Sequence, residues 1–343
     1  MEKVKLNHKT IGEFLLNYAL YFILGVIIFA VIIIEPKFAT LSNFINILKQ
    51  ASTKGILALG CAGLIVLAGT DLSIGRVLGL SAAVTASLVQ STQYASRMYP
   101  QITEPVSLWI PFALSILVAV IFSLINGFGV AKLHLHAFII TLGTQLIAYG
   151  TTCIYIESQP SGSAQALSTF EKPFLDIVNN TVKLSDTIKI PYVIFYFLIL
   201  AVIMYFIWNK TTLGKNMFAV GGNEEAAAVS GVNVPKTIMF VYLMAGVLYG
   251  IAAFLEAARV QSVGANTGIN YELDAISACV IGGVSFSGGV GNIPGVVVGS
   301  IILQAINYSL YFLGINAYLQ YIIKGLIIIL AVAIDVRKYL AKK

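Results

Sequence analysis

Long apolar runs, separated by short polar segments, make up most of this chain. A helix needs about 20 consecutive, mainly apolar residues to cross the hydrocarbon core of a bilayer. By that criterion the pattern predicts about ten membrane-spanning helices. The runs lie at residues 16–34, 55–70, 72–90, 108–126, 137–156, 191–208, 237–257, 273–290, 294–313 and 318–335. We therefore expect an all-α fold, a polytopic membrane helix bundle that forms a single transmembrane domain over residues 1–343.

Composition supports lipid as the main solvent of this fold. Of the 343 residues, 58% are hydrophobic and 10% are charged, and the mean hydropathy is +0.89. Soluble domains carry about 25% charged residues because their surfaces face water. The net charge of +6 is scattered between apolar runs without a polybasic block, so no nucleic-acid interface is expected. The three cysteines and the pair His134 and His136 lack the spacing of a metal site.

The distribution of Lys and Arg predicts how the bundle is oriented. If the N-terminus is cytoplasmic, more of these residues fall on the inner side than on the outer side, as the positive-inside rule requires. We therefore expect both termini in the cytoplasm, a periplasmic loop at 157–190 and a cytoplasmic loop at 209–236. Lys324 lies within the last run, and its side chain is expected to extend toward the outer interface.

The cytoplasmic loop contains a pattern typical of a short exposed helix. Asn223 follows a Gly221-Gly222 turn and is a suitable N-cap, and two glutamates stand in the first turn that it would cap. The helix is expected to cover residues 224–230 and to stop at Gly231. A short helix of this kind is a natural docking element for a cytoplasmic partner.

Polar and glycine residues interrupt two of the apolar runs. The segments Gly69–Gly75 and Gly283–Gly289 share the pattern G-x-x-apolar-S-x-G, although chance similarity stays open in a chain with 30 glycines. Interrupted helices expose backbone groups that can line a polar pathway through a membrane. The alternative is that Asp71 and Arg76 neutralise each other or lie at the membrane interface. The candidate pathway residues are Thr70, Asp71, Ser73, Arg76, Ser285, Phe286 and Ser287.

Other small and polar residues within the runs predict how helices pack. Gly246 and Gly250 form a G-x-x-x-G pair that lets two helices approach closely. Asn126 and Thr144 are expected to form hydrogen bonds between helices.

The chain lacks the motifs that would make it an energy-consuming enzyme. It has no G-x-x-x-x-G-K-[ST] sequence for nucleotide phosphates, and no nucleophile, acid and base cluster indicates catalysis. Intramembrane carboxylates are also few for a proton relay. We expect no catalytic residues, no metal and no cofactor in this chain, and a conduit whose energy arrives from elsewhere.

Four segments resemble a known family. Residues 58–81 contain Gly-Thr-Asp-Leu-Ser-Ile-Gly-Arg, which is similar to the G-x-D-L-S-x-G signature of monosaccharide permeases of the ribose and galactose type. These permeases are subunits of ATP-binding-cassette importers. Residues 221–231 resemble the E-A-A-x-x-x-G motif with which importer permeases dock on their ATPase. Residues 271–276 and 282–291 complete a resemblance that covers nearly the whole chain.

The resemblance implies an inner-membrane importer subunit for galactose or methyl-galactoside. Ribose or another monosaccharide is the alternative, and an ion-coupled secondary sugar carrier is a second one. The implied partners are a second copy of this chain, an ATP-binding protein with two cassettes and a periplasmic galactose-binding protein. The resemblance assigns ATPase coupling to Glu225, Ala226, Ala227 and Gly231. Docking of the binding protein is expected at Glu256, Arg259, Glu272 and Asp274, although they are also explained as rim charges without a partner.

Overall fold

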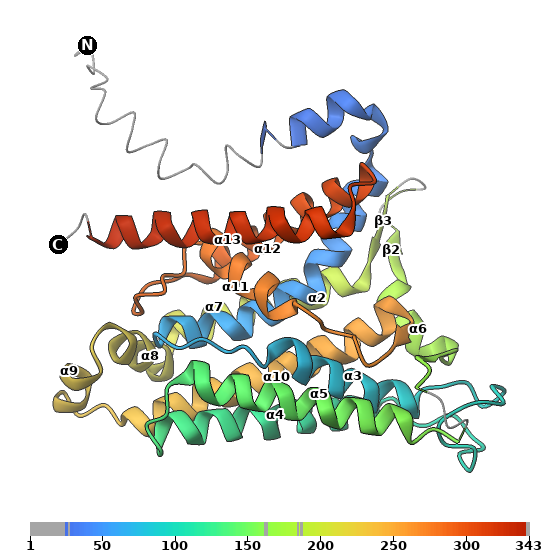
Figure 1. Cartoon of the computed structure of the whole chain (residues 1–343), viewed down its shortest axis with the longest axis horizontal. Helices are drawn as coiled ribbons and strands as arrows, with labels where there is room; N and C mark the ends of the chain where they lie inside the picture. Colours follow the sequence, from blue (N-terminus) through green and yellow to red (C-terminus); the bar gives the residue numbers. More distant parts are fainter. Residues whose placement is uncertain (1–24, 27, 161–163, 184, 186–187, 341–343) are drawn as a thin grey trace.

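The computed structural model describes residues 25–26, 28–160, 164–183, 185 and 188–340 (Figure 1). The long helices are α2 (Leu41–Val66), α4 (Trp109–Ala131), α5 (Ala137–Glu157), α7 (Tyr192–Lys210), α10 (Val234–Val260), α12 (Ile293–Phe312) and α13 (Ala317–Leu340). The shorter helices are η1 (Pro36–Phe38), α3 (Ile74–Leu88), α6 (Lys172–Asn179), α8 (Thr212–Gly222), α9 (Glu224–Val229) and α11 (Tyr271–Ile281). Two antiparallel strand pairs join β1 (Leu167–Ser168) to β4 (Ser262–Val263) and β2 (Thr181–Lys183) to β3 (Lys189–Pro191).

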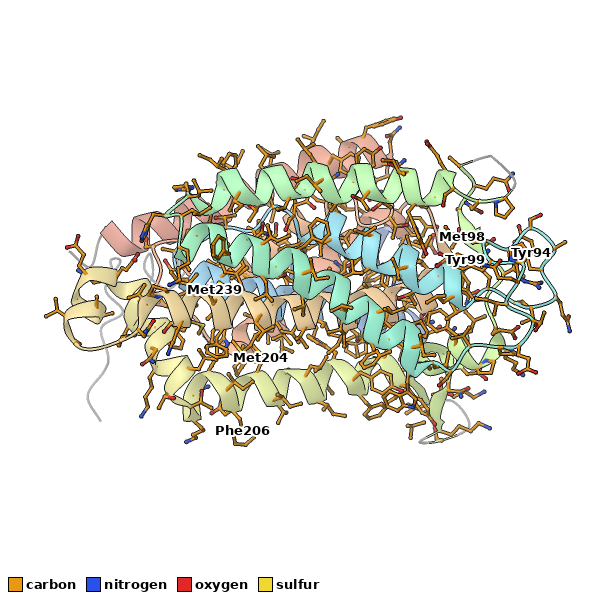
Figure 2. All side chains as sticks on the ribbon, turned by 90° about the horizontal axis from the view of Figure 1, so that it is seen from below. Tyr94, Met98, Tyr99, Met204, Phe206 and Met239 are labelled. Atoms are coloured by element: carbon orange, nitrogen blue, oxygen red, sulfur yellow. The ribbon has the colours of Figure 1, made fainter. Side chains whose placement is uncertain are left out.

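The described residues form a mostly helical bundle with two short strand pairs, as the apolar pattern largely predicts. Five of the helices, α4, α5, α7, α10 and α12, are long and apolar enough to cross a bilayer. Large apolar side chains cover the outside of the bundle: Phe206 is 54% exposed and points away from the helices (Figure 2), and Ile147 is 60% exposed. Such a surface is compatible with lipid and not with water. The count of about ten spans stays a prediction.

Four of the predicted runs differ from the observed helices. The run 55–70 belongs to a longer helix, because α2 begins at Leu41 and ends at Val66. The run 273–290 is not one helix, because α11 ends at Ile281 and Gly283, with a φ of +83°, turns the chain away. Within the run 72–90, α3 has only 15 residues, about 22 Å, which is shorter than a bilayer core. Of the run 16–34, residues 16–24 and 27 lie outside the described residues, and residues 28–34 are helical.

Helix α2 is the central element of the bundle. It contacts α7, α8, α10, α11 and α12, and Figure 1 shows it running obliquely through the molecule. Every residue from Gly55 to Val66 is buried. A helix that is apolar on all sides is stable where protein or lipid covers each side, and in this bundle neighbouring helices cover α2. The other helices therefore take their positions around α2.

The two longest polar segments lie at opposite ends of the bundle. Figure 1 shows α8 and α9 at one end and α6, β2 and β3 at the other. Helix α6 is anchored by Phe174, whose ring lies edge-to-face with Phe254 of α10 at 5.1 Å. The described parts of the segments 209–236 and 157–190 therefore lie at opposite ends of the bundle.

Glycines bring α4 and α10 together as the G-x-x-x-G pair predicts. A Cβ atom at Gly246 would lie 2.9 Å from the Cα of Val120, and one at Gly250 would overlap the backbone of Ile116. A Cβ at Gly127 of α4 would lie 2.9 Å from the Cβ of Tyr242. Contacts this close leave no room for a side chain, so α4 and α10 pack backbone to backbone.

We expect Gly250→Ala to destabilise the bundle by about 1–3 kcal/mol, because the added methyl group overpacks the interface. Thermal unfolding of the purified chain in detergent measures this. The matched control is Gly150→Ala in α5, where an added Cβ has nothing within 4 Å. Equal unfolding temperatures for the two variants would contradict the predicted packing.

Candidate functional site

The first break is the segment 67–73 between α2 and α3. It is irregular chain that turns at Leu67 and at Ala68, whose φ is +59°, and α3 begins near the middle of the bundle (Figure 1). The backbone groups of the break are paired individually. The amide of Gly69 donates to the Leu64 carbonyl at 2.9 Å, and the amide of Leu72 donates to the Thr141 hydroxyl at 3.1 Å. These bonds fix the break against α2 and α5.

Asp71 is fully buried in this break and begins a polar network. Its Oδ1 accepts from the amide of Ser73 at 2.8 Å and from the Ser73 hydroxyl at 2.6 Å. Asn126 of α4 donates to the same hydroxyl at 3.0 Å, and Thr144 of α5 donates to Asn126 at 2.7 Å. The interhelical bonds predicted for Asn126 and Thr144 are confirmed, and they connect α3, α4 and α5 through Ser73.

The Asp71 carboxylate also lies near two buried tyrosine hydroxyls. Asp71 Oδ2 and the hydroxyls of Tyr242 and Tyr249 are all buried. The Tyr249 hydroxyl lies close enough to Asp71 to interact with its carboxylate. Both tyrosines lie within electrostatic range of the Asp71 carboxylate. The two tyrosines occur inside an apolar run, where they count as hydrophobic residues, so the hydropathy pattern does not reveal them. Three such oxygens can bind hydroxyl groups.

Arg76 does not neutralise Asp71. Its guanidinium donates to the carbonyl of Ala265 at 3.3 Å and lies over the ring of Tyr149, 4.2 Å from the centroid. Both Asp71 and Arg76 belong to the described chain, and no ion pair joins them there. Arg76 instead holds α3 to the loop that precedes α11. In the same place, a Cβ at Gly75 would overlap the carbonyl of Gly268.

The second break, residues 282–292 between α11 and α12, is a compact turn. Ser285 is buried, and Phe286 and Ser287 are partly buried. The amide of Ser285 donates to the Val290 carbonyl at 3.0 Å, and the amide of Gly288 donates to the Ser285 carbonyl at 3.1 Å. The positive φ angles of Gly288 (+78°) and Gly289 (+67°) permit this turn.

The two breaks contact each other. The amide of Gly289 donates to the carbonyl of Val66, the last residue of α2, at 2.8 Å. The bond therefore ties the second break directly to the start of the first. The two segments that share a sequence pattern are neighbours in space, joined backbone to backbone.

The predicted docking charges lie inside the bundle. Glu256 is 0% exposed, and its carboxylate accepts from Arg259 at 2.6 and 2.7 Å, from Thr53 at 2.7 Å and from Tyr271 at 2.6 Å. Glu272 is also buried. Arg259 is only 16% exposed, and its charge is already paired with Glu256.

Asp274 forms the centre of a second charged group. It is 5% exposed and pairs with Lys54 of α2 at 2.6 Å and with Lys324 of α13 at 3.1 Å. The expectation that Lys324 extends to the outer interface is therefore wrong, because a buried carboxylate attracts its ammonium group inward. Together the two charged groups connect α2, α10, α11 and α13.

The short helix α9 has the predicted capping geometry. The side chain of Asn223 accepts from the amide of Ala226 at 2.8 Å, and Gly231 has a φ of +86° just after α9. Glu225 and Ala226 are exposed, whereas Ala227 is buried. One detail differs: Gly221 and Gly222 form the last residues of α8 and not a free turn. Figure 1 shows α9 at the extreme end of the molecule.

Comparison with known proteins identifies the class. Residues 43–332 match the family described as branched-chain amino acid transport system / permease component, and the chain belongs to this family. The names of individual relatives also state the solute that each one transports. The galactose/methyl galactoside import permease protein MglC of Escherichia coli K12 is 46% identical over 343 residues, covering 98% of this chain and 99% of that protein.

Other relatives also match over nearly the whole chain, and some of them are named for a different sugar. MglC of Haemophilus influenzae is 44% identical over 339 residues, covering 96% of this chain and 97% of that protein. The ribose import permease protein RbsC of Escherichia coli K12 is 33% identical over 315 residues, covering 91% of each chain. No solved structure gives a significant match to this chain.

We expect Glu256→Gln to destabilise the bundle by about 3 kcal/mol, because the charge of Arg259 loses its buried partner. Arg259 is 16% exposed, which places the cost at the lower end for buried pairs. Chemical denaturation of the purified chain in detergent measures the loss. The exposed Glu104, changed to Gln, is the control and should stay within about 0.5 kcal/mol of the parent. Unchanged stability together with loss of binding-protein-stimulated uptake would instead support docking at Glu256.

Proposed function

We propose that this chain is the permease subunit of an ATP-binding-cassette importer that moves galactose or methyl-galactoside across the inner membrane. The observation that carries the proposal is 46% identity with a galactose/methyl galactoside import permease over practically the whole of both chains. The ribose permeases are also matched along the chain, but at 33–34% identity. Ribose or another monosaccharide is therefore the less favoured substrate.

The energy enters through a separate ATP-binding protein with two cassettes, which docks on α9. An exposed helix capped by Asn223 and ended by Gly231 supports this role. Glu225, Ala226, Ala227 and Gly231 supply the contact, with the buried Ala227 anchoring α9 to the bundle. ATP binds to the partner, and this chain needs neither cofactor nor metal.

A second copy of the chain completes the pathway. Ala68 in the first break is exposed, and Ile269, in the loop before α11, is 44% exposed. Irregular backbone at membrane depth is stable only when protein covers it or when it lines a water-filled cavity. In a homodimer, the second copy covers this irregular backbone and the sugar path between the copies supplies the water-filled cavity. The path is lined by Thr70, Asp71, Ser73, Arg76, Ser285, Phe286 and Ser287.

The sugar arrives from a periplasmic galactose-binding protein. On this proposal both termini are cytoplasmic, about ten helices span the membrane as a single domain, and the segment 157–190 is periplasmic. Because Glu256 and Asp274 pair within the chain, the binding protein contacts the surface above them, with Glu256, Arg259, Glu272 and Asp274 supporting that surface from inside.

Uptake by reconstituted proteoliposomes tests the proposal. Vesicles that contain the permease, the ATPase and the binding protein should accumulate labelled galactose only when ATP is enclosed. Accumulation without the ATPase would contradict the proposal. Uptake that an ionophore abolishes at constant ATP would favour the ion-coupled secondary carrier.

We expect Gly231→Pro and Glu225→Lys to lower galactose uptake per ATP hydrolysed by at least about tenfold while the chain still inserts. Proline cannot adopt the positive φ of Gly231, and a lysine reverses the charge on the docking face. Parallel measurements of uptake and hydrolysis give the ratio. Glu104→Lys, at an exposed site outside α9, is the control and should behave as the parent. Normal accumulation by both α9 variants would count against docking there.

We expect Asp71→Asn to slow galactose uptake by about tenfold, because the amide replaces a charged acceptor of two Ser73 hydrogen bonds, each worth about 1.5 kcal/mol or more. Initial uptake rates at equal permease content measure the effect. Asp176→Asn on α6 removes a carboxylate outside the break and serves as the control. Full activity of Asp71→Asn would leave Asp71 as a structural residue alone.

A further inference from the structure

Helix α8 ends on the junction of the two breaks. A Cβ at Gly221 would overlap the carbonyl oxygen of Val66 and would lie 2.9 Å from the amide nitrogen of Gly289. These are the two atoms that the hydrogen bond between the breaks joins. On the opposite side, a Cβ at Gly289 would lie 2.8 Å from the Cα of Gly222. Glycine at 221 therefore lets α8 lie directly against that bond.

Helices α8 and α9 are connected by the single residue Asn223. The amide of Asn223 donates to the carbonyl of Ala219 in α8 at 3.0 Å, and its side chain accepts from Ala226 in α9 at 2.8 Å. Asn223 is thus bonded to both helices. A displacement of α9 must accordingly move the end of α8.

We propose that Gly221 is a positioning residue that passes a displacement of α9 to both breaks at once. This inference rests on the proposed docking of an ATPase at α9. The end of α8 contacts Val66, the residue just before the first break, and Gly289 in the second break, and Asp71 follows Val66 by five residues. A shift of α8 changes the Val66 to Gly289 contact first and the position of Asp71 next. ATP-driven motion thereby reaches the polar network without passing through α4 or α5.

The residue beside Gly221 provides a matched control. An added Cβ at Gly222 has nothing within 4 Å, whereas at Gly221 it meets backbone atoms that cannot move aside individually. Both glycines belong to α8, and neither has a positive φ angle. Gly221→Ala and Gly222→Ala add the same methyl group to adjacent positions, so only the contact with the junction differs.

Two measurements on the full-length permease test the role. The first is hydrogen exchange at the amide of Gly289, and the second is galactose uptake per ATP hydrolysed by the complete transporter. We expect Gly221→Ala to speed hydrogen exchange at the Gly289 amide by at least tenfold and to lower galactose uptake per ATP hydrolysed by at least fivefold. The ATPase subunit should remain bound to this variant. Gly222→Ala should match the parent in all three.

The outcomes separate this inference from the proposed function. Faster exchange with normal coupling in Gly221→Ala would overturn the positioning role, as would equal exchange in both variants. A parent transporter that fails to use ATP would overturn the proposed function itself, a result visible before any variant is made.

A measurement on the parent covers the case in which Gly221→Ala does not insert. Exchange at Gly289 is compared between the nucleotide-free transporter and the ATP-bound transporter with a hydrolysis-deficient ATPase. A change in protection at Gly289, with none at Gly150 in α5, supports the role of the junction. Equal protection at Gly289 in the two states overturns it.

Discussion

The peptide groups of the two breaks must find hydrogen-bond partners inside an apolar bundle, and much of the architecture depends on this constraint. An unpaired amide or carbonyl in such surroundings costs several kcal/mol, so irregular chain is tolerated only where each group is paired or reaches water. The amide of Gly289 donates to the carbonyl of Val66, which pairs a group of each segment. The Thr141 hydroxyl accepts from the amide of Leu72. Segments more than two hundred residues apart in sequence thus become one structural unit.

Charged residues solve a related problem elsewhere in the bundle. Glu256 and Asp274 would be costly inside the protein without partners, and each has a cation within 2.6 Å. Asp274 of α11 pairs with cations of α2 and α13, and Tyr271 of α11 donates to Glu256 of α10, so these groups fix the three helices against α11. The molecule therefore has one region held by charged, multiply bonded groups and another, at Val66 and Gly289, held by a backbone hydrogen bond between glycine-rich segments. The second region is the better suited to rearrange.

Hydropathy alone predicted α4, α5, α7, α10 and α12 closely, because long apolar runs require long buried or lipid-facing helices. It failed for the run 273–290, where Gly283 turns the chain although the surrounding residues remain apolar. Hydropathy also did not predict that Tyr242 and Tyr249 place buried hydroxyl groups on the otherwise apolar helix α10. The pairing of Glu256 with Thr53 joins α10 to α2 across the sequence, and no local pattern reveals such a contact. The capping of α9 was predictable because all of its determinants are local.

Glycine has two distinct uses in this bundle, and the difference shows where motion is possible. Along α4 and α10, glycines at 127, 246 and 250 bring two continuous helices together over several turns, so separating them would break many contacts at once. At Gly221 the contact is confined to the end of α8 and to backbone atoms of two breaks. Moving that end exchanges few interactions, whereas moving α10 against α4 exchanges many. A displacement applied at α9 is therefore expected to be absorbed at the junction of the breaks, with α4 and α10 moving as a rigid pair.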